Sequence, residues 1–105
     1  GDRFLRRAFH AEEIAHLSSL KMNQAQFLAS RWAVKEATVK AAGKRLLFPE
    51  ITLNKRPSPD PRYSVIVHGK AKEAFAQLGV GTAHASVSHD GEYATAFVML
   101  EKKAS

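Results

Sequence analysis

Residues 32–40 read WAVKEATVK and form the middle of the segment that decides the fold. From Gln24 to Ala42 apolar residues recur at helical spacing, which predicts the longest helix of the chain. Asn23 stands before it as the expected N-cap, and Gly43 follows it as a stop signal. The expected inward stripe consists of Ala25, Leu28, Ala29, Trp32, Glu36 and Val39.

Glu36 allows two interpretations. With Lys40 one turn later it suits an ordinary surface ion pair, which stabilises a helix by about 0.2–0.5 kcal/mol. The other interpretation is a metal-binding carboxylate, because Mg²⁺ prefers oxygen ligands and needs only one or two protein carboxylates beside substrate phosphates. A nearby lysine can then act as a charge on phosphate or, with a lowered pKa, as a proton acceptor. The position of Glu36 in the stripe favours the second, while the spacing leaves both open.

The segments around this helix predict an α+β fold: a small, mainly antiparallel sheet packed on one long helix plus short helices. Residues 55–62 contain three prolines and are expected to form a loop. Asp90-Gly91 is typical of a hairpin turn. We expect a helical turn at 3–9, helices at 11–20 and 70–78, strands at 51–53, 63–68, 83–88 and 93–100, and a frayed tail at 101–105.

The last expected strand, residues 93–100, is mostly apolar at both alternating sets of positions. A strand without a polar face is expected to be central in its sheet or covered on both sides.

Length and composition bound the class of protein. The 105 residues, 45% hydrophobic and 25% charged, predict one globular domain over 1–105. The absence of cysteine excludes disulfides, thiolate metal sites and thiol catalysis. No apolar run reaches the roughly 18 residues of a membrane span, so no membrane partner is expected.

The net charge is +6. This favours an anionic partner: nucleic acid, a phosphorylated cofactor, anionic lipid or an acidic protein. The alternative is that the surplus positive charge serves only to keep the protein soluble. The aromatic residues fall in apolar stripes and form no exposed stacking row, so nucleic acid is not expected as a partner. A non-catalytic basic binding module remains the alternative from another functional class.

Local catalytic motifs are scarce. The chain has no GxGxxG, P-loop, GxSxG or HExxH sequence, and its five histidines lack the paired spacing of a zinc site. His89 differs from the others because it ends an expected strand at a tight turn, where functional residues gather.

Three stretches carry a resemblance in combination: RFLRRAFHAEEI (3–14), FLASRWAVKEATVKAAGK (27–44) and HASVSHDGEYATAFVML (84–100). Their order and spacing resemble the holo-[acyl-carrier-protein] synthase family of 4′-phosphopantetheinyl transferases over almost the whole chain. The resemblance implies transfer of the phosphopantetheine arm of coenzyme A to a serine of an acidic apo acyl carrier protein, with Mg²⁺. It also implies the small α+β fold of that family, commonly a homotrimer with active sites between subunits.

The same resemblance implies roles for particular residues. Glu36 matches the metal carboxylate, and Lys40 matches the lysine near the reacting phosphate. The implied coenzyme A contacts are Arg31, Lys35, Lys44 and His89. Arg3, Arg6 and Arg7 match the basic surface that meets the carrier protein. A degenerate domain that only docks carrier proteins is the alternative within the family.

The chain departs from the family pattern at two places. The family begins with a G-I-D-I strand whose aspartate is the second metal carboxylate; we expect this chain to lack that strand, and Asp2 is not an obvious substitute. Residues 41–51, AAGKRLLFPEI, lack the G-x-G of many bacterial members and look more like organellar or eukaryotic relatives. The expected location is the cytoplasm, with a mitochondrion or another organelle as the alternative.

Overall fold

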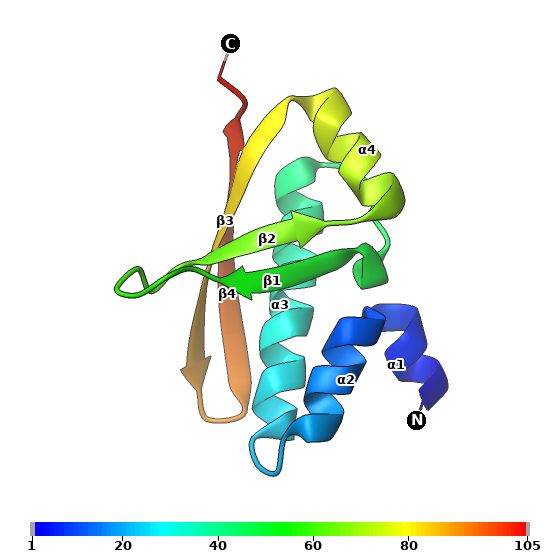
Figure 1. Ribbon diagram of the computed structural model, residues 1–105, viewed down its shortest axis with the longest axis vertical. Coiled ribbons are helices and arrows are strands. Elements are labelled where there is room, and N and C mark those ends of the chain that lie inside the picture. Colours follow the sequence, from blue (N-terminus) through cyan, green and yellow to red (C-terminus); the bar gives the residue numbers. More distant parts are fainter. Residues whose placement is uncertain (1, 105) are drawn as a thin grey trace.

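The computed structural model describes residues 2–104 (Figure 1). In chain order its elements are α1 (Asp2–Ala8), α2 (Ala11–Ser19), α3 (Gln24–Ala42), the 3₁₀ turn η1 (Phe48–Glu50), β1 (Ile51–Lys55), β2 (Tyr63–Val67), α4 (Gly69–Leu78), β3 (Val80–Asp90) and β4 (Tyr93–Lys102). The strands form one antiparallel sheet in the order β1-β2-β3-β4. The predicted α+β fold is confirmed.

The helices cover one face of this sheet. In Figure 1, α3 stands alongside the β3–β4 hairpin, α4 packs near one end of the molecule, and α1 and α2 lie together near the other. The core between these layers draws on α3, α4, three strands and the segment before η1. Its buried members are Val34, Leu46, Ile51, Val65, Ala71, Phe75, Ala83 and Ala85.

The buried face of α3 differs from the predicted stripe. Its buried residues are Ser30, Val34, Lys35 and Thr38, whereas Ala25, Trp32 and Glu36 are exposed. The physical reason is hydrogen bonding: polar side chains enter a core when each finds a partner, which apolar periodicity does not register. The Thr38 hydroxyl donates to the Val34 carbonyl at 2.7 Å, and the Ser30 hydroxyl to Phe27 at 2.8 Å.

The structure confirms the predicted stop signal at the C-terminal end of α3 but shows a different geometry at its N-terminal end. Gly43 adopts the left-handed conformation (φ +66°) and its N–H donates to the Val39 carbonyl, as a helix stop requires. Asn23 stands at the N-cap position, but its backbone is left-handed and its side chain makes no capping hydrogen bond. The prediction of a side-chain cap at Asn23 is therefore wrong.

The hairpin of β3 and β4 is longer than predicted. Val80 pairs with Lys102, and the Lys103 N–H donates to the Gly79 carbonyl at 2.7 Å, so the chain is held at residues expected to be frayed. β4 is also an edge strand, not a central one. Alternate residues from Ala94 to Leu100 are partly buried on the helix side, while the opposite face is open.

A stability prediction concerns Gly69, the first residue of α4, which has φ +55°. A Cβ there would lie 2.3 Å from the Glu50 carboxylate, which caps the helix by accepting from the N–H groups of Lys70 and Ala71 at 3.2 and 3.0 Å. Gly69→Ala should therefore lower the free energy of unfolding for two reasons. Alanine is strained in the left-handed conformation, and the loss of the Glu50 cap costs about 1 kcal/mol more.

Gly79→Ala is the matched control, because Gly79 has φ +75° and open space where its Cβ would stand. Urea denaturation should show Gly69→Ala to be the more destabilised variant. Equal losses would show that the Glu50 contact does not stabilise α4.

Candidate active site

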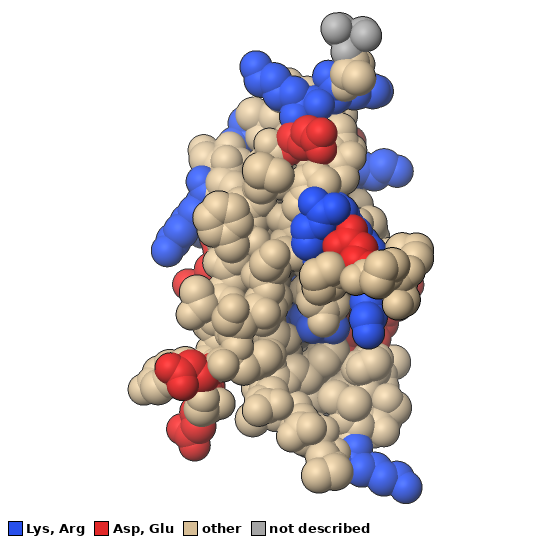
Figure 2. Space-filling view, turned by 90° about the vertical axis from the view of Figure 1, so that its left-hand side faces the viewer, with Lys and Arg blue, Asp and Glu red and all other residues tan. Residues whose placement is uncertain are grey.

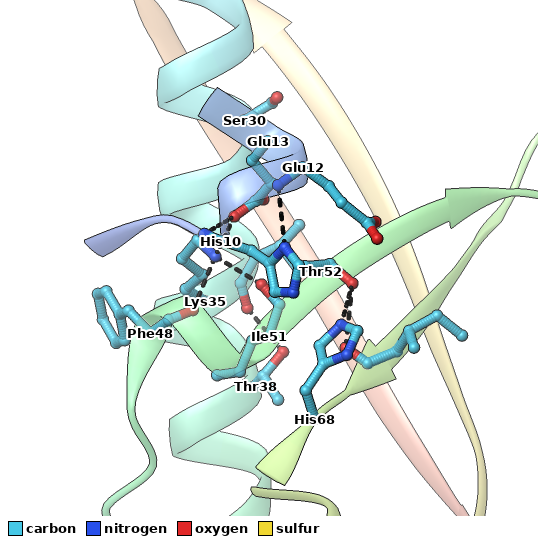
Figure 3. Close-up of polar contacts among 12 residues, drawn as sticks. His10, Glu12, Glu13, Ser30, Lys35, Thr38, Phe48, Ile51, Thr52 and His68 are labelled. Carbon is cyan, nitrogen blue, oxygen red and sulfur yellow. Dashed lines mark hydrogen bonds and ion pairs between the residues drawn. The ribbon is translucent and has the colours of Figure 1, made fainter. Parts of the chain in front are cut away.

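Lys35, on α3, is only 1% exposed and donates all three ammonium hydrogens inside the protein (Figure 3). They go to Glu13 Oε1 at 2.8 Å, to the Phe48 carbonyl at 2.8 Å and to the Ile51 carbonyl. Burial lowers the pKa of Lys35, and the hydrogen bond to Glu13 opposes that shift. With no free hydrogen and almost no exposed surface, Lys35 as placed is unable to contact coenzyme A directly.

Its partner Glu13 is 7% exposed and lies in the first turn of α2. Glu13 Oε1 also accepts from the His10 N–H at 2.9 Å, while His10 Nδ1 accepts from the Glu12 N–H at 3.0 Å. This is a capping box with histidine at the N-cap. Sequence analysis missed the role of Glu13; the spacing of His10 and Glu13 was the available signal.

Glu36 faces away from this buried pair. It is exposed and lines a cavity of about 340 Å³ between α1, α3 and the β3–β4 turn. Trp32 stands in the wall of this cavity, with its ring 6.1 Å from that of Phe4 and 4.9 Å from that of Phe48. The other lining residues are Phe9, Leu28, Ala29, Ala33, Glu92, Tyr93 and Ala94.

The simple surface ion pair is not formed. Within residues 2–104, the cations of the ion pairs are Lys35, Arg56, Arg62 and His84, and Glu36 and Lys40 are not within 4 Å of each other. Lys40 is exposed one turn beyond Glu36 on the same side of α3. Both side chains are thus available to a ligand.

Arg31 points elsewhere. It lines a separate cavity of about 180 Å³ with Glu12, Glu13, His16, Phe27, Thr52, Leu53 and Asn54. Its guanidinium carbon lies 4.5 Å from the centre of the Phe27 ring and 5.8 Å from that of Tyr63. Burial lowers the pKa of Arg31, against the influence of Tyr63 and Glu13.

The expectation that Arg31 and Lys35 share one cleft with Glu36 is therefore wrong for a single chain. Five residues along a helix turn the side chain by about 140°, so Arg31 and Glu36 lie on different faces of α3.

His89 and Lys44 are also apart. His89 is exposed near the end of β3 and pairs with Ala94, beside the turn that meets the first half of α3. Lys44 is exposed just beyond the other end of that helix. Thirteen residues at 1.5 Å each place Ala42, the last residue of α3, about 20 Å along the helix from Ala29. Figure 1 shows the β3–β4 turn and the C-terminal end of α3 toward opposite ends of the molecule.

Arg3, Arg6 and Arg7 are exposed on α1. Arg6 borders a shallow groove between α1 and α2, whose other lining residues are Leu5, Ala11, Ile14 and Ser18. The structure thus offers a basic surface with an apolar strip beside it.

Residues 2–104 contain no group of three or more His, Asp or Glu side chains arranged around a possible metal ion. No helix among them has both the length and the apolarity to cross a bilayer.

Residues 1–98 match the family model of the 4′-phosphopantetheinyl transferase superfamily. The chain belongs to this superfamily. Among curated relatives, the holo-[acyl-carrier-protein] synthase of Koribacter versatilis is 38% identical, with 96% of this chain and 82% of the relative covered. The fatty acid synthase subunit alpha of Candida albicans is 36% identical, with 95% of this chain and 5% of that subunit covered.

Solved structures agree with this assignment. The holo-[acyl-carrier-protein] synthase of Neisseria meningitidis shares the fold, with a TM-score of 0.83 at 24% identity over 97% of this chain and 82% of that one. The Helicobacter pylori synthase in complex with coenzyme A has a TM-score of 0.72 at 25% identity, over 94% and 82%. The resemblance to the holo-[acyl-carrier-protein] synthase family is confirmed, and the protein is a phosphopantetheinyl transferase.

Proposed function

We propose that this phosphopantetheinyl transferase moves the 4′-phosphopantetheine group from coenzyme A to a serine of an apo acyl carrier protein, with Mg²⁺. The observation that carries the proposal is the state of Glu36: an exposed carboxylate at a cavity, unpaired with Lys40 one turn away. The named relatives support it, since several are holo-[acyl-carrier-protein] synthases and one was solved with coenzyme A.

The residues at this cavity fit a magnesium ion. Glu36 and Glu92 both line it, and carboxylate oxygens are the ligands that Mg²⁺ prefers, completed by water and phosphate oxygens. In our proposal Glu36 holds the ion. When bound, Mg²⁺ supplies positive charge that neutralises the pyrophosphate of coenzyme A as its bond breaks. Lys40 is placed one turn away, where its ammonium form would stabilise the same developing charge or its neutral amine form would accept the proton of the carrier serine.

The coenzyme A site is proposed to lie between subunits. Arg31, Lys44 and His89 are the remaining expected contacts, and a single chain places them on different faces and ends of α3. A hairpin from a second copy laid against α3 would place the His89 of that copy beside basic groups of the first. This separation supports a homotrimer with shared active sites.

The outer face of β4 supports the same assembly. Tyr93, Phe97 and Met99 are 80%, 72% and 51% exposed on the side of the sheet that no helix covers. Figure 2 shows a broad uncharged area on this side of the molecule, beside a group of basic and acidic residues near the middle and with acidic residues at the lower left. An apolar patch with charged margins is typical of a protein–protein interface.

The acidic carrier protein is proposed to dock on α1. Exposed Arg3, Arg6 and Arg7 provide complementary charge, which speeds encounter and is weakened by salt. The likeness to a fatty acid synthase subunit supports a carrier of fatty acid synthesis.

Transfer from coenzyme A to an apo carrier protein tests this function, with the mass increase of the carrier as the readout and any segment preceding residue 1 included. We expect no transfer after chelation by EDTA and recovery with Mg²⁺. Lys40→Ala should lower turnover by about 10²-fold, because it removes a charge beside the reacting phosphate.

Lys70→Ala, an exposed lysine at the start of α4, is the control and should keep normal turnover. An unchanged rate in Lys40→Ala would contradict the role of Lys40. RNA binding without any transfer would favour the basic binding module instead.

A further inference from the structure

The ammonium of Lys35 joins α3 to two stretches that are distant in the sequence, residues 9–13 and 48–51. It reaches Glu13 on α2, the carbonyl of Phe48 in η1 and that of Ile51 in β1, and it lies 5.2 Å from the ring of Phe9, which follows α1. Figure 3 shows these groups converging on the one side chain. Lys35 thus connects α3 to the part of the chain that carries the docking arginines.

The helix α2 is attached to α3 at its start and near its end. At the start, Glu13 Oε1 accepts from Lys35 and from the His10 N–H, so one carboxylate oxygen ties this turn to α3. Near the end, the Gln24 side chain donates to the Leu17 carbonyl at 3.2 Å, and the rings of His16 and Phe27 stack at 4.9 Å. The contact of Glu13 with Lys35 is the ion pair among these attachments, and it fixes the start of α2.

Stability alone is a weak reason for such a pair. Moving two charges out of water is costly, and apolar residues of similar size often replace a buried ion pair without loss. What the pair supplies is geometry, because three acceptors on separate segments hold the ammonium at one point. Glu36 is the next residue of α3, so a rotation of the helix that moves Lys35 also moves the proposed metal ligand.

We infer that Lys35 and Glu13 act as a positioning pair, which holds the carrier-docking helices α1 and α2 at a fixed orientation to Glu36 and Lys40. The inference rests on the proposed transfer to a carrier protein. Neither residue touches the reacting atoms. They set where the serine of a docked carrier arrives relative to the proposed metal and to Lys40.

The test is the double variant Glu13→Gln/Lys35→Met. It removes both charges together, so no unpaired charge remains buried, and the glutamine oxygen still accepts from the His10 N–H. Circular dichroism and thermal unfolding establish that it is folded at the assay temperature. Steady-state kinetics then give kcat and KM for coenzyme A and for the apo carrier separately.

Thr38→Val is the matched control. Thr38 is a fully buried polar residue on the same helix, but its hydroxyl bonds only to Val34 of α3 and joins no other segment. It should keep the KM for the carrier within about twofold of the wild type.

We expect the folded double variant to keep its KM for coenzyme A within about twofold and to lose at least tenfold in kcat/KM for the carrier, with a raised carrier KM. A purely structural role would lower kcat in proportion to the unfolded fraction and leave both KM values unchanged, which would overturn the inference. A normal carrier KM in the folded double variant would overturn it as well. Transfer by the wild type in the same assay tests the proposed function separately, because only its absence counts against that function.

Discussion

Glu36→Gln is expected to lower magnesium-dependent transfer by about 10²–10³-fold, the largest effect on activity that we predict for one substitution. Glutamine keeps the size of the side chain but loses the negative charge that would hold the ion. Because Glu36 is exposed, the fold should be unaffected, since surface substitutions away from special features usually change stability by less than about 0.5 kcal/mol.

The measurement is the initial rate of transfer over a range of Mg²⁺ concentrations. Part of the loss should recover as Mg²⁺ is raised, because the weakened site is then filled more often. Glu73→Gln, at an exposed position of α4, serves as the control for loss of one surface carboxylate. If Glu36→Gln kept the wild-type rate at every Mg²⁺ concentration, Glu36 would not be the metal ligand.

Phe97→Asp is expected to convert the proposed trimer to monomers and to reduce transfer by at least about 10²-fold. The side chain is 72% exposed in the single chain, so a carboxylate there costs the monomer little. In an interface the same carboxylate would be buried without a partner, which is strongly unfavourable. Activity should fall with the assembly, because His89 of one copy would no longer reach the α3 helix of another.

Sedimentation velocity measures the mass, and the transfer assay is run at the same protein concentration. Met22→Asp is the matched control, because Met22 is also 72% exposed but lies in the connection between α2 and α3, outside the strands of the sheet. A wild type that sediments as a monomer, or a Phe97→Asp variant that stays trimeric, would contradict the proposed assembly.

The main elements were predictable because their signals are local. Helical spacing and the left-handed Gly43 define the end of α3, and Asp90-Gly91 stands at the β3–β4 turn. The end of β4 was not predictable, since Lys102 is polar and stays in the sheet through backbone pairing with Val80. Backbone hydrogen bonds are indifferent to side-chain polarity, so a hydrophobicity pattern ends too early there.

In the candidate site, too, some features were predictable from the sequence and others were not. The separation of Arg31 from Glu36 was predictable from spacing alone, because five residues along a helix turn the side chain to a different face. The burial of Lys35 was not, because its acceptors come from Glu13, Phe48 and Ile51, which are 13 to 22 residues distant in the chain.

The sequence by itself determined the α+β class, the family and the helix that carries WAVKEATVK, because these depend on local pattern and on residue identity. Only the tertiary structure decided what each charge in that stretch does. Lys35 is held inside because three acceptors from other segments satisfy its ammonium. Glu36, the next residue, is turned by about 100° to an open cavity with no cation of the chain paired to it among the described residues. The cost of desolvation explains the difference between Lys35 and Glu36, because a charge remains buried only where the fold supplies its hydrogen-bond or ion-pair partners.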